Sequence, residues 1–248
     1  MNRNEQAPEK RVQGDGLSLA VNSIFHTIQG EGPFAGTPAV FVRLAGCNLQ
    51  CPLCDTEYTK RLQMPIIDIT SAVSRAIPVW PNGRSAQLPE PYRCPTNLVV
   101  ITGGEPFRQP LGRLVMALRH IGYRVQVETN GTLYQPVFPY PDEGVTLVCS
   151  PKAGQVHREL VPWIAAWKYV ATADNIDPAD GLPTHALEHP NGGRLYRPPS
   201  GNTAPVYLQP VDEQDPTANE RNMHAVVDAC MEHGHRLCLQ LHKIIGAP

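Results

Sequence analysis

Three cysteines lie within eight positions of the chain. Cys47, Cys51 and Cys54 follow a C-x-x-x-C-x-x-C spacing directly after an apolar run. Thiolates bind the soft iron of iron–sulfur clusters, and cysteines this close together on one loop can face a single cluster. Three ligands rather than four leave one iron open. The spacing therefore predicts a cluster that binds a small molecule rather than one that only carries electrons.

Two simpler interpretations remain open for these cysteines, a structural zinc site and a group of unrelated buried thiols. Structural zinc requires four protein ligands. Cys94 could be the fourth, although it lies in a proline-rich stretch with no second ligand beside it. Because short cysteine patterns give false positives, this segment alone favours the cluster only modestly.

A second pattern decides between these interpretations. The apolar run Leu98–Thr102 leads straight into Gly103-Gly104-Glu105-Pro106. Paired glycines at a strand end let a ligand approach the backbone closely, and Glu105 adds an acceptor for an amino group. Alone, this would be a plain turn. Together with the cysteine loop it resembles the radical S-adenosylmethionine superfamily, in which C-x-x-x-C-x-x-C binds a 4Fe–4S cluster and a GGE-type strand end holds the methionine amino group.

Polar residues before the cysteines indicate what else could bind. Gln29 and Glu31, in the stretch Thr27–Gly32, could hydrogen-bond the edge of a purine- or pterin-like ring. Arg43 could hold a carboxylate in bidentate fashion. The plainer interpretations are a glycine turn and a surface charge on a strand.

In this order the motifs resemble the 7-carboxy-7-deazaguanine synthase family, over nearly the whole chain. The resemblance implies ring contraction of 6-carboxy-5,6,7,8-tetrahydropterin to 7-carboxy-7-deazaguanine with loss of ammonia, in queuosine and deazapurine biosynthesis. The enzyme would be a carbon–nitrogen lyase. Further segments that carry the resemblance are Glu128–Thr132, Ser150–Lys152, Trp167–Val170, Leu208–Pro210 and Leu239–Gly246.

The resemblance also implies the site residues, with no catalytic side chain beyond the cofactors. Cys47, Cys51 and Cys54 would bind the cluster, and Thr56 would bind Mg²⁺. The substrate would contact Ile28, Gln29, Gly30, Glu31, Arg43, Thr102, His242 and the terminal carboxylate of Pro248. S-adenosylmethionine would contact Leu53, Cys54, Asp55, Gly104, Glu105, Ser150, Pro151, Lys152 and Gln209.

The family further implies a homodimer and an electron donor such as flavodoxin or ferredoxin. Two rivals remain. One is another radical S-adenosylmethionine enzyme, such as one that activates a partner protein. The other is a non-catalytic zinc or electron-transfer module. For His242 the plain interpretation is a core histidine on a strand, and for Pro248 a frayed chain end.

Composition limits the class of protein. The 248 residues include 21 Lys plus Arg against 23 Asp plus Glu, a net charge of −2. This balance predicts neither nucleic-acid nor membrane-surface binding. There is no apolar run of about 18 residues to span a membrane and no export signal at the start, so a cytoplasmic location is expected.

Apolar runs alternate with helical patterns and predict an α/β fold. We expect an incomplete TIM-like barrel, with a doubly wound sheet as the alternative. Residues 1–16 read as a flexible extension and 17–248 as one domain with a Pro-rich insertion near 78–97. Helices are expected over Ile69–Ile77, Leu111–Ile121 and Thr217–Gly234, the last with a Thr217-x-x-Glu220 capping box. Strands are expected at Ala39–Leu44, Leu98–Thr102, Arg124–Thr129, Val145–Cys149, Trp167–Ala171, Val206–Gln209 and Arg236–Leu241.

Overall fold

A single sheet organises the computed structural model, which describes residues 4–54, 56–78, 96–140, 143–186 and 193–247. Within these residues the sheet has nine strands in the order β3-β1-β2-β4-β5-β6-β7-β8-β9. The strands are β1 (Ser18–Ile28), β2 (Pro38–Leu44), β3 (Leu62–Pro65), β4 (Leu98–Gly103), β5 (Arg124–Thr129), β6 (Val145–Cys149), β7 (Ile164–Ala171), β8 (Val206–Pro210) and β9 (Arg236–Leu237).

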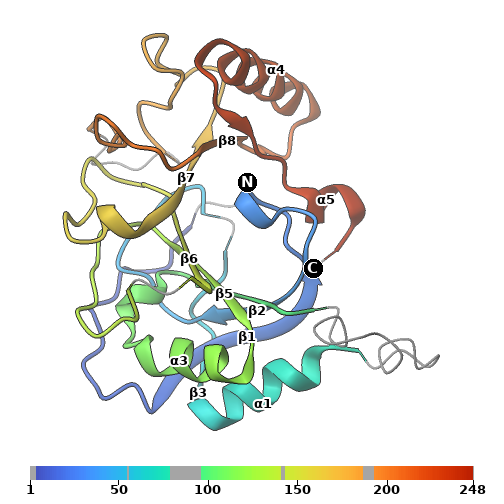
Figure 1. Ribbon diagram of the computed structural model, residues 1–248. Coiled ribbons are helices and arrows are strands. Elements are labelled where there is room, and N and C mark those ends of the chain that lie inside the picture. Colours follow the sequence, from blue (N-terminus) through green and yellow to red (C-terminus); the bar gives the residue numbers. More distant parts are fainter. Residues whose placement is uncertain (1–3, 55, 79–95, 141–142, 187–192, 248) are drawn as a thin grey trace.

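The sheet is parallel from β2 to β9, and only β1 and β3 run antiparallel to their neighbours. It curves around a central space without closing (Figure 1). Parallel strands are covered on both faces and therefore read as continuous apolar runs. All four residues of Leu98–Ile101 are fully buried, as this requires. The predicted incomplete α/β barrel is confirmed.

The helices α1 (Ile66–Ala76), α3 (Gly112–Ile121) and α4 (Pro216–His233) cover the outer face of the curved sheet. The short α5 (Leu241–Ile245) packs against β1. Helices α1 and α3 lie side by side at one end of the molecule, and α4 lies at the other end (Figure 1). Most of the apolar face predicted for the second helix is buried, including Leu114, Val115 and Leu118, whereas Ile121 at its end is exposed.

The start of α4 differs from the predicted capping box. Asp215 is the N-cap residue, and its carboxylate accepts a hydrogen bond from the amide of Ala218. Pro216 occupies the first helical turn, where its missing N–H has no cost. The helix therefore begins before Thr217. It ends as predicted at Gly234, which adopts a left-handed conformation with φ of 73°.

Three strands depart from the sequence prediction, and one of them is the short β3, which was not expected. The antiparallel β1 was not expected, because polar residues such as Asn22 and His26 interrupt its apolar pattern. The run predicted as a strand over Arg236–Leu241 is too long, since β9 ends at Leu237. Beyond it the chain turns back toward β1, where the amide of Leu241 donates to the carbonyl of Gly30. His242 consequently lies on α5 and not on a strand.

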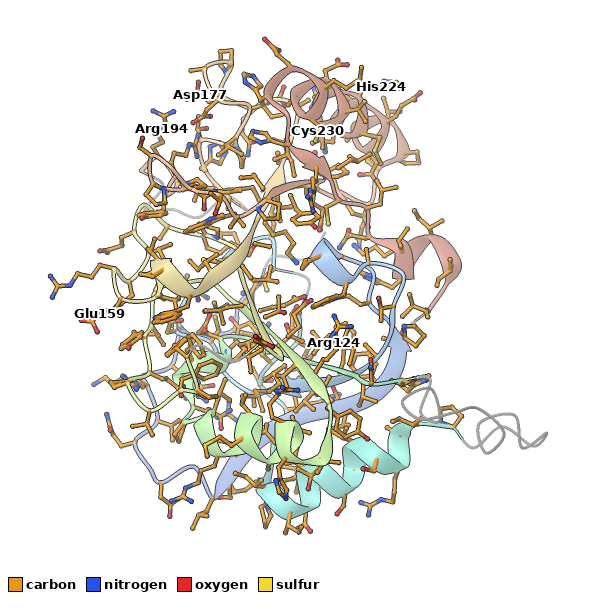
Figure 2. The ribbon with its side chains drawn as sticks, viewed as in Figure 1. Arg124, Glu159, Asp177, Arg194, His224 and Cys230 are labelled. Carbon is orange, nitrogen blue, oxygen red and sulfur yellow. The ribbon has the colours of Figure 1, made fainter. Side chains whose placement is uncertain are left out.

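The remaining segments are irregular. Most of the proposed insertion, residues 79–95, lies outside the described residues, as does Cys94. The long segment after β7 carries ion pairs, and Figure 2 shows Asp177 and Arg194 together near α4, with a carboxylate–guanidinium distance of 2.9 Å. In the part of the chain that the structure describes, no helix is long and apolar enough to cross a membrane.

Candidate functional site

A cavity of about 330 Å³ opens at the carboxyl ends of the parallel strands. Ligand sites of α/β barrels lie at this end, where successive strands deliver side chains to one place. Each of several strands contributes a polar residue to the wall: Arg43 from β2, Thr102 from β4, Glu128 from β5, Lys168 from β7 and Gln209 from β8. The curved sheet thereby gathers residues that are far apart in the sequence.

The three cysteines line this cavity together. None of them forms a disulfide. Their loop begins at Gly46, whose φ of 80° is in the left-handed region, and a Cβ there would lie 2.4 Å from the guanidinium of Arg108. Burial raises the pKa of Cys47 to about 12 and that of Cys51 to about 11. Thiols with such raised pKa values keep their protons at neutral pH, so metal binding must displace these protons.

The spread of the thiols bears on what they can hold. Among the described residues, no three His, Cys, Asp or Glu side chains converge closely enough to hold a single metal ion. A structural zinc ion needs four converging ligands. The cysteines of an iron–sulfur cluster bind different irons and can stand further apart. Three thiols on one cavity wall fit a cluster that is held by three cysteines and has one open iron.

The glycine pair at the end of β4 lies directly against the cysteine loop. A Cβ on Gly103 would come within 2.1 Å of the carbonyl oxygen of Leu44, and a Cβ on Gly104 within 2.3 Å of that of Gly46. Only glycine fits at these two positions. Gly104 also lines the cavity, so its backbone is open to a ligand, as the sequence pattern predicted.

Glu105 is not brought to the cavity. Its side chain is fully buried, and both carboxylate oxygens have partners in the fold. They accept hydrogen bonds from the amide of Phe107 at 2.9 Å, from the hydroxyl of Thr129 at 2.7 Å and from the amide of Asn130 at 2.7 Å. Burial raises the pKa of this carboxyl to about 7 despite the three donors. Glu105 ties the end of β4 to the end of β5.

Asn130 continues this connection to the cysteine loop. Its side-chain amide donates to the side-chain oxygen of Asn48 at 3.0 Å, and Asn48 donates to the hydroxyl of Thr132 at 2.8 Å. The Glu128–Thr132 motif therefore supports the loop on one side, a role that the sequence alone did not indicate.

A buried ion network forms the opposite wall. The ammonium of Lys168 forms an ion pair with Glu31 and lies 3.7 Å from Glu128. Gln240 donates to Glu31 at 3.1 Å, and Gln29 donates to Glu128 at 3.0 Å. Burial alone would lower the pKa of Lys168, but the two carboxylates raise it above its ordinary value. Burial opposes ionisation of Glu31 as well, yet the charge of Lys168 holds its pKa below the ordinary value.

Sequence reasoning assigned no role to Lys168 or Glu128. A signal was available, because each is a charged residue within an apolar strand that is otherwise buried. Buried charges in strands are rare unless they are paired.

Arg43 lies across the cavity beside two aromatic rings. Its guanidinium is 5.3 Å from the ring centroid of Phe25, which stacks on Phe41 at 5.4 Å. The Nε of Arg43 is buried and has no hydrogen-bond partner within the described residues. A buried donor without an acceptor is costly, so this one indicates a ligand acceptor that belongs in the cavity.

Of the other predicted site residues, most line the cavity, a few do not, and two lie outside the described residues. Gly30 packs against His242, since a Cβ there would lie 2.3 Å from the imidazole Nδ1. Pro151 is buried, but it is not part of the cavity wall that the structure describes. Asp55 and Pro248 lie outside the described residues. The predicted residues that do line the cavity, besides the cysteines and Arg43, are Ile28, Gln29, Glu31, Leu53, Thr56, Thr102, Gly104, Ser150, Lys152, Gln209 and His242.

Comparisons with known proteins agree on one family name. A scan of family models finds no match to the chain. The 7-carboxy-7-deazaguanine synthase of Rhodospirillum rubrum is 43% identical over 238 residues, which cover 94% of each chain. The synthase of Rickettsia prowazekii is 38% identical over 240 residues, covering 95% of this chain and 91% of the relative. The synthase of Bacteroides thetaiotaomicron is 31% identical over 226 residues, covering 91% and 96%.

A solved structure is similar in fold. The crystal structure of QueE from Escherichia coli superposes with a TM-score of 0.63 and covers 90% of this chain and 94% of its own. Its sequence is 22% identical. This likeness supports the partial barrel independently of the sequence motifs.

Proposed function

The chain belongs to the 7-carboxy-7-deazaguanine synthase family, and we propose on this premise that it converts 6-carboxy-5,6,7,8-tetrahydropterin to 7-carboxy-7-deazaguanine with release of ammonia. The reaction would serve queuosine or another deazapurine pathway. It needs a site that holds a carboxylate, an amidine-like ring edge and a reactive cofactor at once.

The observation that carries the proposal is that Arg43, whose Nε has no hydrogen-bond partner among the described residues, lines the same cavity as the three thiols. A substrate carboxylate would supply the missing acceptor, and a guanidinium binds a carboxylate through two parallel hydrogen bonds. The stack of Phe25 and Phe41 beside Arg43 offers an apolar surface that suits a flat heterocycle.

The opposite wall suits the other edge of the pterin. Glu31 and Gln29 present acceptors and donors that match the alternating groups of that edge. Lys168 keeps Glu31 ionised, so its carboxylate can accept hydrogen bonds from ring N–H groups. His242 closes the same side from α5.

The cysteine side of the cavity would hold the cofactors. Cys47, Cys51 and Cys54 would bind a 4Fe–4S cluster, and Gly104 would leave room for S-adenosylmethionine beside it. When bound, these cofactors supply a radical that abstracts a hydrogen atom from the pterin C6. Ser150 and Lys152, which line the cavity, would contact the S-adenosylmethionine from this chain.

Four finer assignments rest on family resemblance. Thr56 would be a ligand of a Mg²⁺ ion that is completed by substrate oxygens and water. The chain would form a homodimer in the cytoplasm. Its electrons would come from flavodoxin or ferredoxin. Glu105, in contrast, would act by holding β4 in place.

The test is a turnover assay with the anaerobically reconstituted protein, a reductant, S-adenosylmethionine and the pterin. The proposal predicts formation of 7-carboxy-7-deazaguanine by wild type and none by Cys51→Ala. A wild type that holds its cluster and cleaves S-adenosylmethionine without making this product would instead support a protein-activating enzyme. Bound zinc without labile sulfide would support a non-catalytic module.

A further inference from the structure

The N-terminal segment 4–12 lies along the outer side of the cysteine loop. The sequence predicts a flexible extension here because the residues are polar. In the structure the segment makes hydrogen bonds to the loop at four separate carbonyl oxygens, those of Cys47, Cys51, Pro52 and Thr56. Since the thiols of the loop line the cavity, the segment and the cavity lie on different sides of the same backbone.

Asn4 forms hydrogen bonds with the middle of the loop. Its amide donates to the carbonyl of Pro52 at 2.8 Å. Its side-chain nitrogen donates to the carbonyl of Cys51 at 3.1 Å and to the hydroxyl of Tyr58 at 3.2 Å. The tyrosine is 1% exposed, so this part of the segment lies over a buried ring.

The side chain of Gln6 forms two hydrogen bonds at the end of the loop, one as a donor and one as an acceptor. Its side-chain nitrogen donates to the carbonyl of Thr56 at 2.9 Å, and its side-chain oxygen accepts from the amide of Tyr58 at 2.7 Å. It also bonds the side-chain oxygen of Asn4 through its own amide at 3.0 Å. The two side chains therefore form one unit.

Glu9 forms a hydrogen bond with the start of the loop. Its amide donates to the carbonyl of Cys47 at 2.6 Å. Its carboxylate pairs with Arg61 beyond the loop and, at 3.2 Å, with the buried guanidinium of Arg108. That guanidinium also donates to the carbonyl of Ala45, just before the first cysteine. Both ends of the cysteine loop are thereby fixed to the body of the protein.

We propose that Asn4, Gln6 and Glu9 are positioning residues, which clamp the loop in its cluster-binding form and slow loss of the cluster. The proposal rests on the proposed function only in assuming that the loop holds a cluster. The described residues of the loop between Gly46 and Leu62 form no helix or strand, so few of their backbone groups are fixed by neighbouring strands. Hydrogen bonds from Asn4, Gln6 and Glu9 hold backbone groups of the loop that the sheet does not hold.

The expected effect follows from the bonds removed. One net hydrogen bond contributes about 1 kcal/mol, which corresponds to about a fivefold change in a local opening equilibrium. Opening of the loop would move its cysteine ligands away from the irons and so favour iron release. Asn4→Ala and Gln6→Ala should each speed iron release about fivefold or more, and the double variant should exceed either one.

The experiment measures iron release from the cluster-loaded protein to an iron chelator under anaerobic conditions, followed by the visible absorbance of the cluster. Hydrogen exchange of residues 47–58 is measured in parallel on the metal-free chain. The matched control is Glu5→Ala, because Glu5 is an exposed residue between the two. A second variant, Asn4→Asp, keeps the shape and the acceptor but removes the donor to Cys51.

The proposal expects faster iron release and faster loop exchange for Asn4→Ala, Gln6→Ala and Asn4→Asp, with Glu5→Ala at the wild-type rates. Urea unfolding should show that all four chains remain folded. Wild-type rates in the three clamp variants would overturn the clamp while leaving the proposed function intact. A wild type that takes up no cluster would overturn the proposed function. Hydrogen exchange of residues 47–58 in the metal-free chain would then still show whether Asn4 and Gln6 hold the loop.

Discussion

Lys168, in the middle of β7, forms an ion pair with Glu31, which follows β1 and lies 137 residues earlier in the chain. The side chains of the pair are 9% and 14% exposed, and Glu128 lies on the other side of the ammonium. One buried positive charge therefore holds two carboxylates at the cavity wall. This arrangement connects the first strand to the far half of the barrel.

Replacing Lys168 by Met should leave both carboxylates buried without a counter-ion. Breaking such a pair costs about 3–5 kcal/mol, because the remaining charge stays desolvated. Urea unfolding of the metal-free chain measures the loss. The control is Arg221→Ala, whose pair with Asp174 is exposed and should be worth less than about 1 kcal/mol. Equal, small losses for the two variants would contradict the network.

Arg43→Lys should weaken pterin binding while preserving the charge, since lysine lacks the planar fork that binds a carboxylate at two points. A charge-assisted hydrogen bond contributes about 1.5–3 kcal/mol, or roughly 10- to 150-fold in affinity. Calorimetry on the cluster-loaded protein without reductant measures it.

Arg124→Lys is the matched control for this substitution. Arg124 also lies over a phenylalanine ring, at 4.4 Å from the centroid of Phe34, but outside the described cavity wall. Its replacement should leave affinity unchanged. Equal affinities for wild type and Arg43→Lys would remove the role assigned to Arg43.

Thr56→Ala should weaken the dependence of turnover on Mg²⁺. Removing a ligand should raise the Mg²⁺ concentration for half-maximal rate by about tenfold or flatten the response, whereas Thr56→Ser keeps the hydroxyl and the response. The measurement is initial rate against Mg²⁺ after chelator treatment. The same Mg²⁺ response in wild type and Thr56→Ala would rule this ligand out.

Glu105 should make stability depend on pH. Its pKa is raised from 4.5 to about 7 in the folded chain, so the folded state holds this proton more tightly than the unfolded state. The resulting stabilisation is fully present below pH 4.5 and is lost as the pH rises through about 7. Glu105→Gln, which cannot ionise, should therefore gain stability relative to wild type between pH 5 and pH 8.

The control for this pH effect is Glu57→Gln. Hydrogen bonds, led by that from the Thr59 hydroxyl, lower the pKa of Glu57 to about 2, so it stays ionised over the whole range. Its difference from wild type should be constant between the two pH values. Urea unfolding of the metal-free chain measures both differences. A constant difference for Glu105→Gln would show that the buried carboxyl does not change ionisation there.

Much of the sheet could be predicted because its strands are buried on both faces. Runs such as Leu98–Ile101 are apolar throughout, and the structure places them as parallel strands. The strand β1 escaped prediction because polar residues interrupt its pattern, and its end also supplies Thr27 and Ile28 to the cavity. A strand that contributes residues to a binding cavity therefore need not show the regular apolar pattern by which strands are predicted.

The site was predictable where local spacing encodes it. The three cysteines are close together in the sequence, and position 104 has no room for a Cβ. All four residues line the cavity. Glu105 reads as a ligand group by its position, but only the fold shows that Thr129 and Asn130 occupy its carboxylate. The charge of Lys168 within an apolar strand signals a buried pair, but its partners Glu31 and Glu128 come together only through the tertiary fold.

The most direct test of the central claim is the stoichiometry of the reaction with limiting S-adenosylmethionine. We propose that the hydrogen atom taken from the pterin C6 is returned at the end of the reaction, so that the cofactor is regenerated. We predict that wild type forms one ammonia for each 7-carboxy-7-deazaguanine and many products for each S-adenosylmethionine, and that Cys51→Ala forms neither. Consumption of the cofactor without ammonia or the deazaguanine, by a protein with its cluster intact, would contradict the account.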